Sequence, residues 1–336
     1  MKKKFFALVI IISLFSQVSP ANVFASEEDL SLKDAAIAID ETSDISNITE
    51  GVVETKEEVY AETNGDLVTI SKDESNILQV ESDEVEDFSI ELPSDDDTLE
   101  VIDDDIIMTE GEGFSIGTEI GDSEIRNSFV IESEASPETY EVEFKLPQGT
   151  YLRYAKDLEG VEDGSIEVAD NFGDVIMAID LPYAYDAEGK ALNTYYVLKN
   201  NKVTQVVKHK GMENIAYPIV ADPSVKFGSW FKKSSGWGMN GKWRCLKLKP
   251  KLSLRAAGVC AYAGLGVIVS NSVANASWKA VYNKYHKSRY WKNTKGMKNQ
   301  YYCHFYFAFA KESFNLEPGR PSVSWQKTIK ALCNPT

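Results

Sequence analysis

The sequence predicts a multidomain chain in which an acidic, antiparallel β-rich N-terminal region precedes a small, disulfide-containing α+β C-terminal domain. Three observations support this fold class. Acidic and basic residues are sorted into different parts of the chain, short runs of alternating apolar and polar residues fill the acidic part, and all four cysteines and all six tryptophans lie after residue 226. Alternation with a period of two is the pattern of strands with one buried face.

The charge of the chain is divided near residue 225. Residues 26–225 contain 12 Lys and Arg against 50 Asp and Glu, whereas residues 226–336 contain 20 Lys and Arg against only Glu312 and Glu317. The formal net charge of -17 therefore conceals a strongly basic segment. Such a segment favours anionic partners, and it also predicts an intramolecular contact with the acidic part.

The first 25 residues have the pattern of a secretory signal peptide. Lys2, Lys3 and Lys4 precede an apolar run over residues 5–15, and small residues lead to an expected cleavage site after Ala25. The run is shorter than the ~20 residues that span a bilayer, so a cleaved signal is favoured over an uncleaved anchor. We therefore expect a secreted protein, either extracellular or associated with the cell wall.

Residues 26–62 are acidic and lack a large aromatic residue until Tyr60. They contain only short apolar clusters, such as the one over residues 35–39. This composition buries too little apolar surface to offset the entropy of ordering, which predicts a disordered acidic tail.

Short runs with period-two alternation continue from residue 63 to residue 223 and predict an acidic β-rich domain. Asn200 and Asn201 separate two runs as a loop that tolerates positive φ, which predicts a hairpin. The acid clusters 95–97 and 103–105 lack the ligand spacing of a calcium loop, so we interpret them as solvated edges. The runs are Leu67–Ile70, Phe88–Ile90, Phe114–Ile116, Phe129–Ile131, Tyr140–Leu146, Ser165–Val168, Val175–Ile179, Thr194–Leu198 and Val203–Val207.

The end of this region resembles a known N-terminal module. Residues 135–223 contain LPYAYDAEGK at 181–190, VTQVV at 203–207 and YPIVADP at 217–223. They are similar to an N-terminal region that precedes varied C-terminal domains in secreted Gram-positive proteins. The resemblance implies a presentation region or pro-region rather than an active site. Residues 224–241, which follow two prolines, are expected to form a linker.

Residues 242–336 are predicted to form the basic domain. Its first strand alternates apolar and cationic residues, which gives it one face of each kind, with a break at Pro250. The following run, residues 256–269, is apolar but too short to span a membrane, and we expect a buried helix or strand. The apolar positions of the strand are Leu246, Leu248, Leu252 and Leu254.

A helix is predicted after this run. Its apolar residues recur at the spacing of one helix face, so its aromatic residues are expected in the core. The later aromatic residues Tyr290, Trp291, Tyr301 and Tyr302 lie in polar, lysine-rich surroundings and are expected nearer the surface. The helical stripe consists of Ala274, Trp278, Val281 and Tyr285.

All four cysteines, Cys245, Cys260, Cys303 and Cys333, lie in the basic domain. In an exported chain they predict two disulfides, and four cysteines allow three connectivities. We favour Cys245 with Cys260 and Cys303 with Cys333, because each of these pairs closes a modest loop. The sequence contains neither a CxxC pair nor an HxxxH pattern, so a zinc site is not expected.

Three motifs near the C-terminus carry a second resemblance. Residues 299–304 read NQYYCH, residues 313–321 read SFNLEPGRP and residues 333–335 read CNP. Together they are similar to a secreted Gram-positive family known only as a domain of unknown function, over about residues 242–335. The resemblance implies export and a shared fold, and it implies no activity.

The basic domain offers few catalytic residues. The sequence has no GxSxG, HExxH, P-loop or dinucleotide-binding motif, and no cofactor is expected. The candidates are His304, Glu317 and Arg320. With a lysine or His286, His304 would act as a general base on a phosphodiester, which predicts a secreted nuclease as one alternative. A packed structural histidine and a turn-stabilising contact between Glu317 and Arg320 are the favoured interpretations.

Binding is better supported than catalysis. Cations interleaved with aromatic side chains are typical of surfaces that meet anionic polymers or lipid headgroups. We therefore expect the basic domain to bind the anionic bacterial envelope, wall polymer or membrane, as an antibacterial effector shielded by the acidic region. Nucleic acid as the ligand, and a structural role in the cell wall or spore coat, are the alternatives. The residues expected on the anionic-ligand surface are Lys247, Lys249, Lys251, Lys287, Arg289, Trp291 and Lys292.

Overall fold

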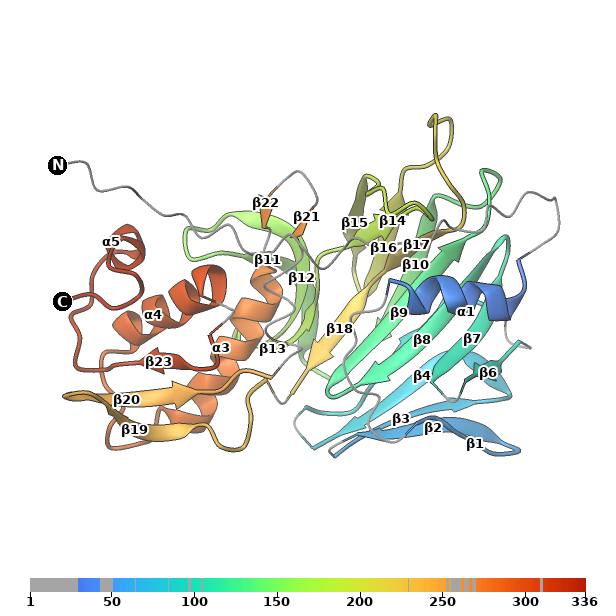
Figure 1. Ribbon diagram of the computed structural model, residues 1–336. Coiled ribbons are helices and arrows are strands. Elements are labelled where there is room, and N and C mark those ends of the chain that lie inside the picture. Colours follow the sequence, from blue (N-terminus) through green and yellow to red (C-terminus); the bar gives the residue numbers. More distant parts are fainter. Residues whose placement is uncertain are drawn as a thin grey trace.

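The computed structural model shows a β-rich region and a smaller helical part beside it (Figure 1). The expected signal peptide, residues 1–25, lies outside the described residues. The structure describes residues 30–336 except 43–50, 64, 84, 96–97, 104, 229, 252–253, 255–260, 263–265, 268–269 and 309–310.

Two large sheets build the β-rich region, and their described strands pair antiparallel, which confirms the predicted fold class (Figure 1). The first sheet has the order β1 (Val53–Glu54), β2 (Glu58–Thr63), β3 (Asp66–Ser71), β4 (Glu74–Ser82), β5 (Phe88–Glu91), β10 (Thr139–Lys145), β16 (Lys202–Val207), β15 (Thr194–Lys199). The second has the order β11 (Thr150–Lys156), β12 (Glu162–Asp170), β13 (Val175–Ile179), β18 (Ser224–Phe227), β9 (Glu124–Ile131), β8 (Phe114–Gly121), β7 (Ile106–Gly111), β6 (Glu100–Ile102). In this second sheet β17 (Ile219–Asp222) pairs with β9 and with β14 (Tyr183–Tyr185).

The main core joins these two sheets, because one apolar cluster draws buried residues from both of them. Phe88 on β5 meets Phe227 on β18 edge to face, with ring centroids 5.5 Å apart. Tyr140 on β10 stacks on Phe129 of β9 at 4.8 Å. Aromatic pairs of this kind add to the free energy gained from apolar burial, and they fix how one sheet packs on the other.

Helix α1 (Leu32–Asp40) covers the outer face of the second sheet (Figure 1). Its residues Ala35 and Ile39 are fully buried in a cluster with Met108 and other residues of the sheet. Strands β8 and β9 are therefore buried along their whole length. Gly117 on β8 makes the close packing possible, since a Cβ atom there would lie 2.2 Å from Cδ1 of Ile39.

The structure differs here from the predicted disordered tail over residues 26–62. Among the described residues of that segment, 32–40 form α1 and 58–62 belong to β2. Ser31 begins the helix by accepting a hydrogen bond from the Asp34 N–H at 3.2 Å. The apolar face of a short helix gains enough burial when a sheet is already present to receive it, which composition alone does not reveal.

The structure also differs from the predicted linker over residues 224–241. Strand β18 pairs with β9 and β13 inside the second sheet, and β19 (Gly236–Asn240) starts the C-terminal sheet. The hairpin predicted at Asn200 is confirmed, because β15 and β16 pair there and Asn200 has φ 54°. The segment between the two parts is thus mostly structured.

The C-terminal part has α+β architecture, as predicted. The sheet β19–β20–β23 packs with two helices, and the predicted apolar stripe is confirmed because Ala274, Trp278 and Val281 are buried. Leu252 and most of the apolar run 256–269 lie outside the described residues. The elements are β20 (Trp243–Leu248), β21 (Ala261–Tyr262), β22 (Gly266–Val267), α3 (Asn271–Tyr285), α4 (Thr294–Phe307), β23 (Phe314–Leu316) and α5 (Trp325–Lys330).

Helix α3 joins the two parts of the chain, since it packs against β11, β12 and β13 (Figure 1). The side chain of its N-cap residue, Ser270, makes no capping hydrogen bond. Instead Asp163 on β12 accepts a hydrogen bond from the Asn271 N–H at 2.7 Å, which places a carboxylate at the positive end of the helix. Val175 and Ala178 of β13 belong to the same apolar cluster as Trp278. The β-rich region therefore completes the core of the C-terminal part.

Candidate functional site

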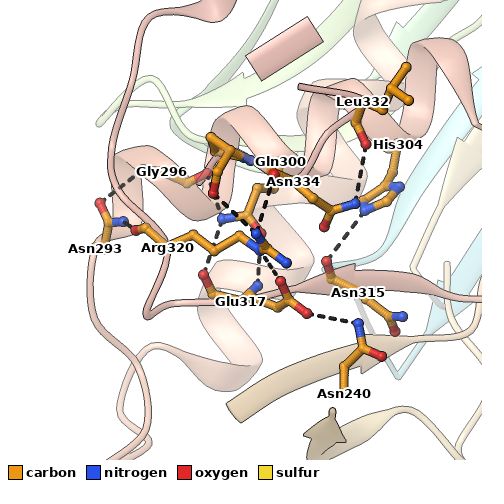
Figure 2. Close-up of polar contacts among 11 residues, drawn as sticks. Asn240, Asn293, Gly296, Gln300, His304, Asn315, Glu317, Arg320, Leu332 and Asn334 are labelled. Carbon is orange, nitrogen blue, oxygen red and sulfur yellow. Dashed lines mark hydrogen bonds and ion pairs between the residues drawn. The ribbon is translucent and has the colours of Figure 1, made fainter. Parts of the chain in front are cut away.

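A buried polar network around Glu317 lies at the centre of the C-terminal domain (Figure 2). Glu317 has no exposed surface and forms an ion pair with Arg320. Its carboxylate also accepts a hydrogen bond from Asn240 Nδ2 at 2.8 Å. The Gln300 side chain on α4 accepts from the Glu317 N–H at 2.8 Å and donates to the Glu317 carbonyl at 3.2 Å. Both the backbone and the side chain of Glu317 are thus satisfied inside the domain.

Arg320 connects this network to the end of the chain. Its guanidinium donates to the carbonyl oxygens of Asn334 and Pro335, both at 3.2 Å. It also lies 5.0 Å from the ring centroid of Trp243, within the range of a cation–π contact. The preferred interpretation of Glu317 and Arg320 as a turn-stabilising pair agrees with these contacts. Figure 2 shows the two side chains pointing toward one another.

His304 is buried, which makes it unsuited to act on a substrate. Its exposed fraction is 2%, it stacks on Phe314 with an interplanar angle of 6°, and Nε2 lies 3.3 Å from the Asn315 carbonyl. Burial lowers the pKa of His304 to about 4, so the ring is neutral at physiological pH. These contacts give no support to the nuclease alternative, which needs an accessible general base.

One disulfide is confirmed. Cys303 on α4 bonds to Cys333 across a sequence separation of 30 residues.

The predicted partner of Cys245, Cys260, lies outside the described residues, and Cys245 itself is a buried free thiol. Burial, with the nearby carboxylate of Glu317, raises the pKa of Cys245 to about 12. The thiol is therefore protonated and unreactive at neutral pH.

Replacing both Cys303 and Cys333 by serine is expected to destabilise the C-terminal domain by roughly 3.5 kcal/mol, the loop-entropy value for 30 closed residues. Urea unfolding followed by tryptophan fluorescence measures this change, because all six tryptophans lie between residues 230 and 325. Dithiothreitol should lower the stability of the parent protein by a similar amount and leave the double variant unchanged. Equal stability of the parent and the variant under oxidising conditions would contradict this role of the bond.

Two predicted surface aromatic residues are in the core instead. Tyr301 and Tyr302 have no exposed surface. The hydroxyl of Tyr301 donates to Ser277 Oγ at 2.6 Å, and that of Tyr302 donates to the Asn275 side chain. Their lysine-rich sequence neighbours point elsewhere because an α-helix turns successive residues by about 100°. The expectation of surface positions is therefore wrong for both tyrosines.

The residues predicted for the anionic-ligand surface have different surroundings. Lys251 does not face solvent freely, because it forms an ion pair with Asp122 of the β-rich region at 2.5 Å. Trp291 is half-buried and packs on Trp278 and Tyr282. Lys247 is half-buried, and the exposed residues of the set are Lys249, Lys287, Arg289 and Lys292.

Arg289 belongs to a cation–aromatic group that we call the Tyr290 cluster, formed by Trp237, Arg244, Arg289 and Tyr290. The Cζ atoms of Arg244 and Arg289 lie 4.4 and 4.7 Å from the Tyr290 ring centroid. Trp237 lies 5.6 Å from the same ring, centroid to centroid. A hydrogen bond from Arg289 to the Tyr290 hydroxyl, 2.5 Å long, lowers the pKa of that hydroxyl. Strand β20 supplies Arg244 and the loop after α3 supplies Arg289, so adjacency in sequence does not reveal the pair.

The two arginines of the Tyr290 cluster form no ion pair with an acid among the described residues. Of the two acids in the basic segment, Glu317 is committed to Arg320 and Glu312 is exposed. The charge of Arg244 and Arg289 is therefore balanced by solvent ions rather than by the protein. An unpaired guanidinium resting on an aromatic ring is well placed to bind a phosphate or carboxylate group.

The described residues contain no group of three His, Cys, Asp or Glu side chains arranged to hold a metal ion. In the same part of the chain, no helix combines the length and the apolar character that crossing a membrane requires.

No curated protein matches the chain. The C-terminal segment, residues 233–336, matches the model of a family described as a protein of unknown function, and it is therefore a DUF2599 domain.

Proposed function

We propose that this protein is exported and that its DUF2599 domain binds anionic groups of the bacterial envelope through the Tyr290 cluster. The observation that carries the proposal is the convergence of Arg244 and Arg289 on one tyrosine ring, without acidic partners among the described residues. Phosphate-bearing wall polymers and anionic lipid headgroups share the chemistry that such a cluster recognises. A guanidinium group can donate two parallel hydrogen bonds to two oxygens of one phosphate. Trp237 and Tyr290 add apolar contact.

The docked β-rich region leaves this cluster available. It forms ion pairs with Lys251 and Lys279 of the C-terminal part, through Asp122 and Asp174. Neither of these lysines belongs to the Tyr290 cluster. In this arrangement the acidic region covers the side of the domain that carries α3. We therefore propose that the full chain binds without prior cleavage.

Replacing both Arg244 and Arg289 by Gln should weaken binding of the full chain to phosphatidylglycerol vesicles by about 30-fold at low salt. Each cation near an anionic surface contributes roughly 1 kcal/mol, and two such losses correspond to this factor. Co-sedimentation measures the change. Raising the salt concentration should weaken the parent protein much more than the variant, because only the parent retains the two charges.

The matched control replaces Lys327 and Lys330 of α5 by Gln, which removes the same charge from another exposed part of the domain. We expect this control to lose less than about 3-fold, because screening limits the effect of distant charges. Purified wall polymer in place of vesicles shows which source of phosphate is preferred. Equal losses of affinity in the two double variants would contradict the proposal, since binding would then depend on total charge alone.

A further inference from the structure

A polar cleft of about 1140 Å³ lies where the two parts of the chain meet. Strands β11–β13 provide one wall, with Arg153, Glu167 and Asp174 among the lining residues. Helices α3 and α4 provide the other, with Asn275, Lys279, Lys298 and Tyr302. A cavity of this size accepts a small molecule. The cleft exists only while α3 is docked on the sheet, because both parts contribute side chains.

Most charges of the cleft are paired within it. Arg153 Nε lies 2.6 Å from Glu167 Oε1, and Lys156 Nζ lies 3.3 Å from Glu162 Oε1. Lys279 forms an ion pair with Asp174. The remaining acid, Asp157, accepts backbone N–H groups of its own turn at 2.8 Å. The three ion pairs therefore offer a ligand hydrogen-bond donors and acceptors without net charge, while Asp157 adds one negative charge.

Lys298 on α4 is the exception. It is half-buried and its Nζ lies 5.4 Å from the ring centroid of Tyr302, but it has no ion pair or hydrogen bond among the described residues. Burial lowers the pKa of its ammonium group although the charge of the Glu167 carboxylate acts in the opposite direction, which reflects the cost of removing a charge from water. An anionic ligand group beside Nζ would offset that cost.

The wall around Lys298 is held in place before any ligand arrives. Asn275 Nδ2 donates to Glu167 Oε2 at 2.9 Å and to the Lys156 carbonyl at 3.0 Å. The Tyr302 hydroxyl donates to the Asn275 side chain. This chain of contacts links the sheet to both helices. A site whose polar groups are already fixed loses little entropy on binding, which favours affinity for a small ligand.

We propose that this cleft binds a polyol or sugar that carries one anionic group, with the Lys298 ammonium as its counter-ion. The hydroxyl groups of the ligand bond to the paired side chains, and the single unpaired cation selects a phosphate ester or a carboxylate. This site shares no residue with the Tyr290 cluster. It is therefore independent of the proposed envelope binding.

The test is isothermal titration calorimetry of the full chain with two anions and their neutral analogues. Glycerol 3-phosphate is compared with glycerol, and glucuronate is compared with glucose. Lys298→Met should weaken binding of the preferred anion by about 10-fold or more, the loss of one charge-assisted hydrogen bond. Lys295→Met on the same helix is the matched control, because Lys295 is exposed and does not line the cleft. This control should bind as the parent does. The Arg244→Gln/Arg289→Gln variant should also keep its affinity for the anion, which separates a failure here from a failure of the proposed function.

A second measurement needs no variant. Acetic anhydride labelling, read by mass spectrometry, should modify Lys298 in the free protein, because the cleft that its side chain lines is open to solvent. Glycerol 3-phosphate or glucuronate should protect Lys298 and leave Lys295 unprotected. The proposal is overturned if neither anion binds, if the neutral analogues bind equally well, or if Lys298 is labelled at the same rate with and without the anions.

Discussion

Replacing Glu317 by Gln is expected to destabilise the C-terminal domain by about 3–5 kcal/mol, the range for removing one partner of a buried ion pair. The substitution keeps the size of the side chain and removes its charge. Arg320, whose side chain is 11% exposed, would then have a neutral amide oxygen in place of the carboxylate, beside the backbone carbonyl oxygens and the Trp243 ring. A guanidinium left in this position without a carboxylate carries most of the cost.

The chain supplies a matched control for this prediction. Glu312 is the other acid of the basic segment, and it is exposed. Glu312→Gln should therefore change stability by no more than about 0.5 kcal/mol. Urea unfolding followed by tryptophan fluorescence reports on the C-terminal domain for both variants, since no tryptophan lies in the β-rich region. A Glu317→Gln protein as stable as Glu312→Gln would show that the ion pair does not hold the domain together, and would reopen a catalytic role for Glu317.

Local sequence patterns predicted the elements that depend on local chemistry. The two asparagines at 200–201 mark a hairpin because their backbones accept positive φ, and Asn200 has that conformation. The stripe from Ala274 to Val281 marks the buried face of α3 because its spacing follows the helix period. The disulfide between Cys303 and Cys333 was predicted because the two cysteines close a loop of modest length, and their sequence separation is 30. In each case the residues that decide the structure are close together in the chain.

Long-range contacts decide the features that the patterns missed. Helix α1 is stable because Gly117, more than 75 positions later, leaves space for Ile39. Tyr302 is buried, and its hydroxyl is bonded to Asn275, 27 positions earlier on α3. The Tyr290 cluster depends on β20 approaching the loop after α3, so Arg244 was not among the predicted ligand residues. Such pairings depend on how the elements pack, and no local periodicity records them.

The same dependence on distant partners makes Arg126 a sensitive position of the β-rich region. Arg126 has no exposed surface and its Nε lies 2.5 Å from Asp222 Oδ2, while NH1 lies 3.7 Å from Glu119 Oε2. It also donates to the Thr42 carbonyl at 3.3 Å, just beyond the end of α1. One guanidinium thus joins β9, β17, β8 and the segment after α1.

Arg126→Met should lower the free energy of unfolding of the β-rich region by about 3–5 kcal/mol, because it leaves two carboxylates buried without their cation. Far-UV circular dichroism during urea unfolding measures the change. Lys202→Met is the control: its ion pair with Glu141 has the same length, 2.5 Å, but both side chains are exposed. Exposed pairs contribute about 0–1 kcal/mol, so the control should remain close to the parent.

A second variant tests whether the lost stability comes from the buried carboxylate of Asp222. Adding Asp222→Leu to Arg126→Met removes the carboxylate whose ion pair the first substitution breaks, and apolar replacement of a whole buried ion pair is often neutral. The double variant should therefore recover part of the loss. Glu119 would still be buried, which limits the recovery. If the double variant is less stable than Arg126→Met, the arginine acts mainly through its packing on Tyr183, whose ring centroid lies 5.4 Å from Cζ, and not through charge.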